Sequence, residues 1–225
     1  MNIRIWNCAN AALAFLLIGG YAGSRERGMA QAQEQSTATA DKLASPDVKD
    51  LPPMVRNGLP GPMHQRLNGL IGEWQVEMTI YIAGGTKDKP IISRDLTCRR
   101  EWLAETGNRY LRDVTEGSVG GERYYRMGLL GYSIMDKAYE WVTVDALNAN
   151  MMIYHSRGKN SSREISMVGE FTDQGVLGKR YAGKRVAMRT VIRIEGPESN
   201  VFELYMTPSN GREILAVRAK YTRRK

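Results

Sequence analysis

Apolar and polar residues alternate along nearly the whole chain after Gly72, and this two-residue period predicts β-strands. The first predicted strand begins at Trp74 and ends at the turn signal Ala83-Gly84-Gly85. Its apolar residues share one face: Trp74, Val76, Met78, Ile80 and Ile82. Nine further alternating stretches follow, most of them separated by short turns. They cover residues 92–102, 109–116, 123–133, 139–147, 151–156, 163–172, 184–194, 201–206 and 213–222.

No long helical stretch separates these strands, so the sequence predicts an all-β, up-and-down meander of about ten antiparallel strands. A flat sheet of that size would leave exposed edges, and closure into a barrel removes them. A barrel of about ten strands has an interior wide enough for one small ligand. The apolar inner faces and polar outer faces reverse the pattern of an outer-membrane barrel, so we expect a soluble barrel.

The residues just before the first strand follow a helical period instead. Leu67, Leu70 and Ile71 are spaced as on one face of a short helix over residues 63–71. Gly72 stands where the helical period changes into alternation, and a glycine allows the backbone to change direction there without a Cβ clash. The sequence therefore predicts a short N-terminal helix that caps one end of the barrel.

The first 32 residues resemble a secretory signal peptide. Arg4 precedes an apolar run over residues 11–18, which is too short to span a bilayer, and small-residue cleavage sites end at Ala22 and Ala32. An uncleaved N-terminal anchor is the alternative. Residues 33–62 are rich in Ser, Thr, Ala, Asp and Pro and predict a disordered linker. The barrel domain is then expected over residues 63–225, in an exported protein that is periplasmic or secreted.

The chain is basic, with a formal net charge of +8 at pH 7. Residues 1–32 hold three of its 32 Lys and Arg residues and one of its 24 acidic residues, so the chain without them carries +6. An exported protein meets little nucleic acid, so an anionic envelope surface is the expected partner of such charge. Cys8 lies in the signal and Cys98 is then alone, which leaves no intramolecular disulfide and predicts an inert buried thiol.

Several short motifs, in order along the predicted barrel, resemble the domain-of-unknown-function 1579 family, whose fold is thought to be lipocalin-like. They are His64-x-x-Leu67, Leu70-x-Gly72-x-Trp74, Gly128-Leu129-Leu130-Gly131-Tyr132, Asp145, Met151-Met152, Val168-Gly169-Glu170 and Tyr221-Thr222-Arg223. Two positions depart from the family pattern. Ser133 stands where Asp is usual, and Thr143 stands where Trp is usual, with Trp141 displaced. Since the family has no assigned activity, the resemblance implies the fold and export but no mechanism.

The resemblance also implies how the barrel closes. Lipocalin-like barrels often begin the first strand with Gly-x-Trp and carry an Arg near the end of the last strand. Here these residues are Gly72, Trp74 and Arg223. We expect Trp74 to be buried at one end with the Arg223 guanidinium over its ring, a cation–π contact worth about 0.5–2 kcal/mol.

The sequence carries no signature of catalysis or metal binding. His64 and His155 are the only imidazoles, no cluster has metal-ligand spacing, and only His155 lies on a strand where it could bind a haem iron. Nucleophile-elbow and phosphate-loop motifs are absent. The carboxylates of Asp113, Glu116 and Asp145 could be brought together only by the fold. We expect no cofactor. Enzyme activity is the third of three hypotheses, after the two described below.

The predicted lumen is more informative. Arg100 shares the parity of Ile92, Leu96, Cys98 and Trp102, the apolar face of its strand. A cation facing a dry interior must pair, reach a rim or meet an anionic ligand, and if Arg100 points inward, Asp145 is a candidate partner. A β-bulge that turns Arg100 to solvent is the alternative. The candidate lumen residues are Arg100, Trp102, Tyr125, Trp141, Asp145 and His155, and methionines 78, 127, 167, 188 and 206 serve either a cavity or an ordinary core.

The outer face offers a second hypothesis, an envelope-interaction protein with a packed barrel. Five cations on two nearby strands should form a basic patch: Arg185, Arg189, Arg193, Arg218 and Lys220. The first hypothesis is a module that holds a small apolar or amphipathic molecule in its barrel. An open apolar cavity of roughly 300 Å³ or more favours the first hypothesis, and a packed lumen favours the second.

Overall fold

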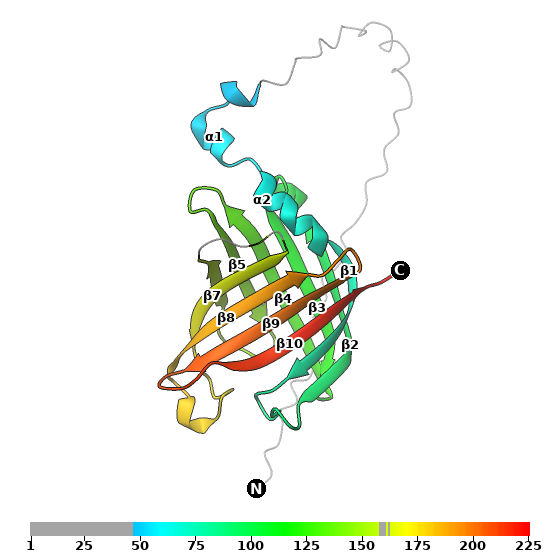
Figure 1. Ribbon diagram of the computed structural model, residues 1–225, viewed down its shortest axis with the longest axis vertical. Helices are drawn as coiled ribbons and strands as arrows, with labels where there is room; N and C mark the ends of the chain where they lie inside the picture. The colour runs from blue at the N-terminus through cyan, green and yellow to red at the C-terminus, as the bar shows by residue number, and fades with distance from the viewer. Residues whose placement is uncertain (1–46, 158–160, 162) are drawn as a thin grey trace, which may run out of the picture. The chain divides into compact units, whose positions relative to one another are not determined.

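Ten antiparallel strands close into a barrel in the computed structural model, which describes residues 47–225 except 158–160 and 162 (Figure 1). Each strand pairs with the next in sequence, and β1 pairs with β10 to close the ring, so the predicted all-β barrel is confirmed. The strands are β1 (Gly72–Ile80), β2 (Ile91–Trp102), β3 (Tyr110–Val119), β4 (Glu122–Ser133), β5 (Ala138–Asp145), β6 (Met152–Ser156), β7 (Glu164–Thr172), β8 (Arg185–Ile194), β9 (Ser199–Pro208) and β10 (Ile214–Arg223).

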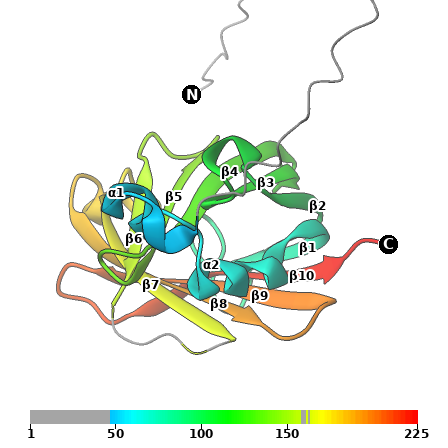
Figure 2. The ribbon, with the colours of Figure 1, turned by 90° about the horizontal axis from the view of Figure 1, so that it is seen from above.

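The helical cap predicted over residues 63–71 is present as two short pieces, α2 (Pro62–Gln65) and η2 (Arg66–Leu70). Figure 2 looks down on α2 at one end of the ring of strands. The first turn is held by His64, whose Nδ1 accepts the Gly61 N–H at 3.1 Å. Leu67 and Leu70 are buried beneath it. Two further 3-10 turns, η3 (Ala104–Thr106) and η4 (Lys179–Tyr181), lie in connections between strands.

The described part of the predicted linker is not irregular throughout. It contains η1 (Val48–Asp50) and α1 (Pro53–Asn57). Asp47 accepts the Lys49 N–H at the start of η1, and a proline occupies the first position of α1, where its fixed φ suits a helix. The predicted signal peptide and the rest of the linker lie outside the described residues. Within them, no helix is both long and apolar enough to cross a membrane.

The seam between helix and barrel is built around Trp74. Its ring is fully buried, and its Nε1 donates to the Leu70 carbonyl at 3.0 Å. The expected cation–π contact is present, with the Arg223 guanidinium carbon 4.4 Å from the ring centroid. Arg223 also donates to the Ile71 carbonyl at 3.0 Å, which joins the last strand to the residue before the first. Gly72 has φ +131°, and a Cβ there would lie 2.3 Å from Arg223 Nη1.

The two ends of the barrel therefore differ. Because β1 starts beneath the helical cap and the strands run up and down, the β1–β2, β3–β4, β5–β6, β7–β8 and β9–β10 connections all lie at the opposite end, which we call the mouth. Beneath the cap the lumen is filled, since Trp74, Leu111 and Tyr139 are fully or almost fully buried there. Any cavity has to open toward the mouth.

A β-bulge in β2 corrects one part of the sequence interpretation. The pairing register shifts between Val76 and Met78, with two residues of β2 opposite one of β1. The shift turns Ile92 outward, where it is 46% exposed, and brings Ser93 inside, so Ile92 does not share a face with Leu96. The bulge precedes Leu96, so Arg100 keeps the inward parity of Cys98 rather than turning to solvent.

We predict that Gly72→Ala lowers the free energy of unfolding by about 2–3 kcal/mol, because the backbone there is strained for any residue with a Cβ and the methyl group displaces Arg223 from Trp74. Urea denaturation measures this. Gly196→Ala is the control, since a Cβ at Gly196 meets no atom within 4 Å. Equal losses in the two variants would contradict the proposed strain at Gly72.

Candidate functional site

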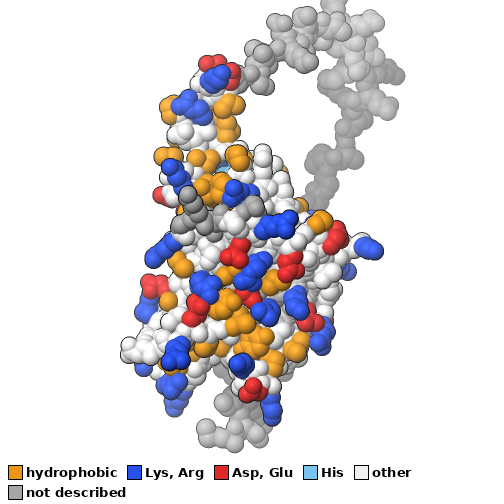
Figure 3. Space-filling view, viewed as in Figure 1, with side chains coloured by type: hydrophobic (Ala, Val, Ile, Leu, Met, Phe, Trp, Pro, Cys, Tyr) orange, Lys and Arg blue, Asp and Glu red, His pale blue; other side chains and the backbone are white. Residues whose placement is uncertain are grey.

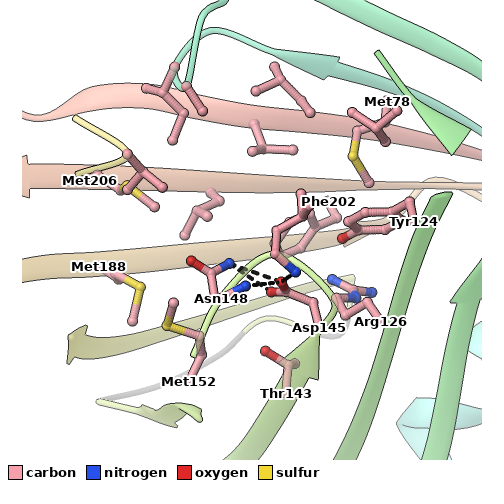
Figure 4. Close-up of a pocket in the computed structure, with 18 of the residues that line it drawn as sticks. Met78, Tyr124, Arg126, Thr143, Asp145, Asn148, Met152, Met188, Phe202 and Met206 are labelled. Carbon is pink, nitrogen blue, oxygen red and sulfur yellow. Dashed lines mark hydrogen bonds between the residues drawn. The ribbon is translucent and has the colours of Figure 1, made fainter. Parts of the chain in front are cut away.

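The mouth half of the lumen holds a cavity of about 440 Å³, above the roughly 300 Å³ at which a ligand site was expected (Figure 4). Its wall is mainly apolar and comes from most of the strands. Side chains that contribute to it are Met78, Ile80, Ile91, Trp141, Met152, Tyr154, Met188, Phe202, Leu204, Met206 and Val217. Val119 at the end of β3 and Val176 in the β7–β8 connection complete the rim.

Methionine supplies much of this wall. Of the methionines expected to face inward, Met78, Met188 and Met206 line the cavity, and Met152 of the Met151-Met152 pair joins them. Met167 is fully buried without lining it. Met127 lies between the buried residues Arg126 and Gly128 and so faces outward. Unbranched thioether side chains adapt to the shape of a ligand more readily than branched ones, which suits a cavity with few fixed contacts.

A polar cluster forms the floor of the cavity, between the apolar wall and the plugged end. Arg126 Nη2 donates to both Asp113 oxygens, at 3.1 and 3.2 Å, and Arg100 Nε lies 3.5 Å from the same carboxylate. Arg100 Nη1 also donates to Asn200 Oδ1 at 2.8 Å, and its guanidinium lies 4.1 Å from the Tyr221 ring centroid. All five residues are buried. Two guanidinium groups thus share one carboxylate.

Arg126 is the member of this cluster that faces the cavity. Its guanidinium carbon lies 5.2 Å from the Trp141 ring centroid and 5.6 Å from that of Phe202. Burial opposes the charged form, but Asp113 and nearby phenol groups outweigh it and raise the pKa of Arg126, so the group stays charged. Burial also raises the pKa of the neighbouring Tyr124 to about 12 and that of the Cys98 thiol above its usual value.

Four buried polar atoms in and around this floor have no hydrogen-bond partner among the described residues: Thr115 Oγ1, Arg126 Nε, Trp141 Nε1 and Asn200 Nδ2. Three of them belong to N–H groups that can only donate. Gly128 makes the crowding around Trp141 possible, since a Cβ at that position would lie 2.6 Å from Trp141 Nε1 and 3.2 Å from an Asp113 oxygen. The glycine of the Gly128-Leu129-Leu130-Gly131-Tyr132 motif thus has a packing role.

Asp145 is not the partner of Arg100, and that prediction is wrong. Asp145 ends β5 at the mouth, whereas Arg100 lies near the capped end of β2, opposite Gly72. The Asp145 carboxylate accepts the backbone N–H groups of Leu147 and Asn148 at 2.7 and 2.8 Å, together with the Asn148 side-chain amide. It lines the rim of the cavity and fixes the β5–β6 loop (Figure 4).

The other predicted lumen residues lie in three different places: in the cavity wall, beneath the cap and on the outer face. Trp141 lines the cavity. Trp102 lies beneath the cap, where its Nε1 donates to Asn68 Oδ1 at 2.9 Å, and it does not line the cavity. Tyr125 and His155 face outward, against expectation. In β6 the buried residues are Met152, Tyr154 and Ser156, which leaves His155 exposed.

The prediction that Tyr125 faces the lumen is wrong because β4 carries apolar residues on both faces. Tyr125, Met127 and Leu129 form the outer face, while Tyr124, Arg126, Gly128 and Leu130 are the buried ones. A cation and a glycine made the true inner face resemble a solvent face. The motif Gly128-Leu129-Leu130 held a usable signal, since a glycine beside leucines suggests close packing inside, and Arg126 shares its parity.

The five cations predicted to form a basic patch lie on the outer face of β8 and β10, but four are paired with carboxylates. Arg185 bonds Glu170, Arg189 bonds Glu213 at 2.7 Å, and Arg193 bonds Glu164 at 3.0 Å. Buried Glu203 lies on β9, between the cation-bearing strands β8 and β10. It accepts hydrogen bonds from Arg193 at 2.7 Å and Arg218 at 2.6 Å. Figure 3 shows basic and acidic side chains interspersed on this face, so the predicted patch is not uniformly basic.

Among the described residues, no group of three or more His, Cys, Asp or Glu side chains could hold a metal ion. His64, the second histidine of the sequence, is buried in the cap, where burial and the charge of Arg109 lower its pKa. The lumen itself combines an apolar cavity with a cationic floor.

Comparison with known proteins gives a family and a distant structural likeness. The family model described as "Protein of unknown function (DUF1579)" matches residues 59–223. No curated protein matches the sequence significantly. Among solved structures, an S-type phycobiliprotein lyase from Guillardia theta is similar, with 12% sequence identity and a TM-score of 0.45, over 75% of this chain and 96% of that one. A likeness of that degree carries no argument about function.

We predict that Asp113→Asn lowers the free energy of unfolding by about 3–5 kcal/mol, because it leaves two buried guanidinium groups without a counter-charge. Urea denaturation measures the loss, with the exposed Asp88→Asn as control. Adding Arg126→Gln removes one of the unpaired charges and should recover part of the stability. Strictly additive losses would show that charge pairing is not the role of Asp113.

We predict that Glu203→Gln lowers the free energy of unfolding by about 1–2 kcal/mol near neutral pH. Burial alone would raise the pKa of Glu203, but hydrogen bonds from Arg218, Arg193 and Tyr205 hold it below its usual value. Because the folded pKa is the lower one, the stabilisation is complete above the unfolded value of about 4.3 and fades as the pH falls through the folded pKa.

Urea titrations of the wild type and Glu203→Gln over that pH range test this dependence. Glu213→Gln is the control, because it breaks a single, more exposed pair with Arg189. A difference between wild type and Glu203→Gln that persists unchanged in acid would contradict the role of the charge.

Proposed function

The chain belongs to the family described as "Protein of unknown function (DUF1579)", and we propose that this member binds one small apolar or amphipathic molecule in the lumen of its barrel. The observation that supports this most is the cavity of about 440 Å³, because side chains fill only the capped half of the lumen. A cavity of that size falls in the range of small-molecule sites, which are concave, mostly apolar and largely preformed.

The form of the cavity favours a binding role for the interior. The Trp74–Arg223 contact and the cap close one end, so a ligand enters and leaves through the mouth. Adaptable methionines on several strands, among them Met78, Met152 and Met206, suit a ligand recognised mainly by its apolar body. The paired charges of the outer face give less support to the alternative, an envelope protein that acts through a basic surface.

Export to the periplasm or the exterior is part of the proposal. It is supported by the sequence of residues 1–32, with a cationic start, a short apolar run and small-residue cleavage sites. Mass spectrometry of the N-terminus of protein recovered from its own cells tests it. A mature chain that starts at residue 23 or 33 is expected, and an intact Met1 in the cytosolic fraction would contradict export.

We predict that the full chain binds N-phenyl-1-naphthylamine, a neutral apolar dye that fluoresces in dry surroundings, and that Met206→Trp weakens this binding about ten-fold or more by filling the cavity. Ile92→Trp is the matched control, since Ile92 is 46% exposed on the outer face. Fluorescence titration measures both. Equal dye binding by the two variants, or none by the wild type, would contradict a lumen site.

Native mass spectrometry of protein purified from its own cells then looks for the natural ligand. A small molecule that travels with the wild type and is lost from Met206→Trp is the expected result. Such a molecule retained by Met206→Trp would place its site outside the cavity.

A further inference from the structure

The floor of the cavity has one positive charge more than it can neutralise internally. Arg100 and Arg126 are both buried and share the single carboxylate of Asp113. Their environment differs in one respect that matters for a ligand. Arg100 is occupied on its other side by Asn200 and the Tyr221 ring, while Arg126 lines the cavity. The excess charge is therefore presented to the cavity by Arg126.

Unsatisfied hydrogen-bond donors lie beside the same charge. Arg126 Nε and Trp141 Nε1 have no partner among the described residues, although Arg126 is 93% buried and Trp141 97%. Leaving a buried donor unpaired costs about 1–3 kcal/mol, more for a charged group. Both groups can only donate, so the atom that satisfies them has to be an acceptor. A cation or a pure donor would satisfy neither of them.

The carboxylate at the rim does not meet this need. Asp145 lies near Arg126 in Figure 4, and the two residues are paired in register across β4 and β5. Its oxygens, however, accept from Leu147 and Asn148 and hold the loop at the mouth. Among the described residues, none of the ion pairs joins Arg126 to Asp145; the only carboxylate within 4.0 Å of Arg126 is that of Asp113.

We propose that the molecule held in the lumen carries a singly charged carboxylate, whose oxygens bind Arg126 on the floor of the cavity while its apolar body extends between the methionines toward the mouth. The inference rests on the proposed function and names the chemical class of its ligand. A single negative charge balances the excess of the floor, and a carboxylate offers acceptors in the plane that a guanidinium prefers. The apolar wall excludes water from the contact and so strengthens it.

Three ligands that share one apolar body and differ in the head test the proposal: decanoate, decanol and decylamine. Each is used to displace N-phenyl-1-naphthylamine from the full-length wild type near neutral pH. We expect decanoate to bind about ten-fold or more tightly than decanol, and decylamine to bind most weakly. Decanol or decylamine binding as tightly as decanoate would overturn the proposal and leave the proposed function standing.

Arg126→Gln tests where the head binds. This variant leaves Arg100 and Asp113 as a neutral pair, so the barrel is expected to fold, which near-ultraviolet circular dichroism checks. Decanoate should lose about ten-fold in affinity while decanol changes less than about two-fold. Arg94→Gln is the control, because Arg94 is an exposed arginine whose partner, Glu77, lies on the outer face.

The outcomes separate the two claims. Decanoate affinity that is unchanged in Arg126→Gln, or reduced equally in Arg94→Gln, overturns the assignment of Arg126. Dye binding without displacement by any of the three compounds also overturns the proposal. Absence of dye binding in the wild type overturns the proposed function and the inference with it. If Arg126→Gln does not fold, the relative affinities of the wild type for decanoate, decanol and decylamine decide whether the proposal holds.

Discussion

The barrel depends on the contact between its first and last strands, where the Arg223 guanidinium lies over the buried ring of Trp74. That contact joins β1, β10 and the residue before β1 in one place, because Arg223 also donates to the Ile71 carbonyl. It strengthens the closure of the ring by the β1–β10 pairing and plugs one end of the barrel. An up-and-down barrel with one plugged end can have a cavity only toward the other, so this contact decides on which side a ligand enters.

The sequence predicted the strands and the helical cap well because the patterns that mark them are local. Alternation marks strands, and the change of period at Gly72 marks the seam, where a positive φ excludes other residues. Short turns between the strands then allow little but a meander. The family resemblance added the Trp74–Arg223 contact, which lies between residues 149 positions apart and which no local pattern reveals.

Side-chain direction was less predictable, for two physical reasons. A bulge in β2 changes parity within a strand, so Ile92 and Leu96 face opposite sides although their spacing is even. In β4 both faces are partly apolar, and the lumen takes the face with Arg126 rather than the one with Tyr125. A buried charge is tolerated only because Asp113, on the neighbouring strand, lies within reach. That partnership is tertiary and cannot be read from alternation.

The polar floor is hard to explain as a stabilising device. Replacing a buried ionic cluster by apolar residues of similar size is often neutral or stabilising, so such a cluster is weak support for a structural role. Here the barrel already has an apolar plug in Trp74 and an apolar wall at the mouth, and the cluster lies between them with an unbalanced charge and unpaired donors. Those features destabilise the empty barrel, and an acceptor bound at Arg126 would balance the charge and pair the Arg126 Nε–H. The floor is therefore better understood as one half of a contact whose other half is a ligand.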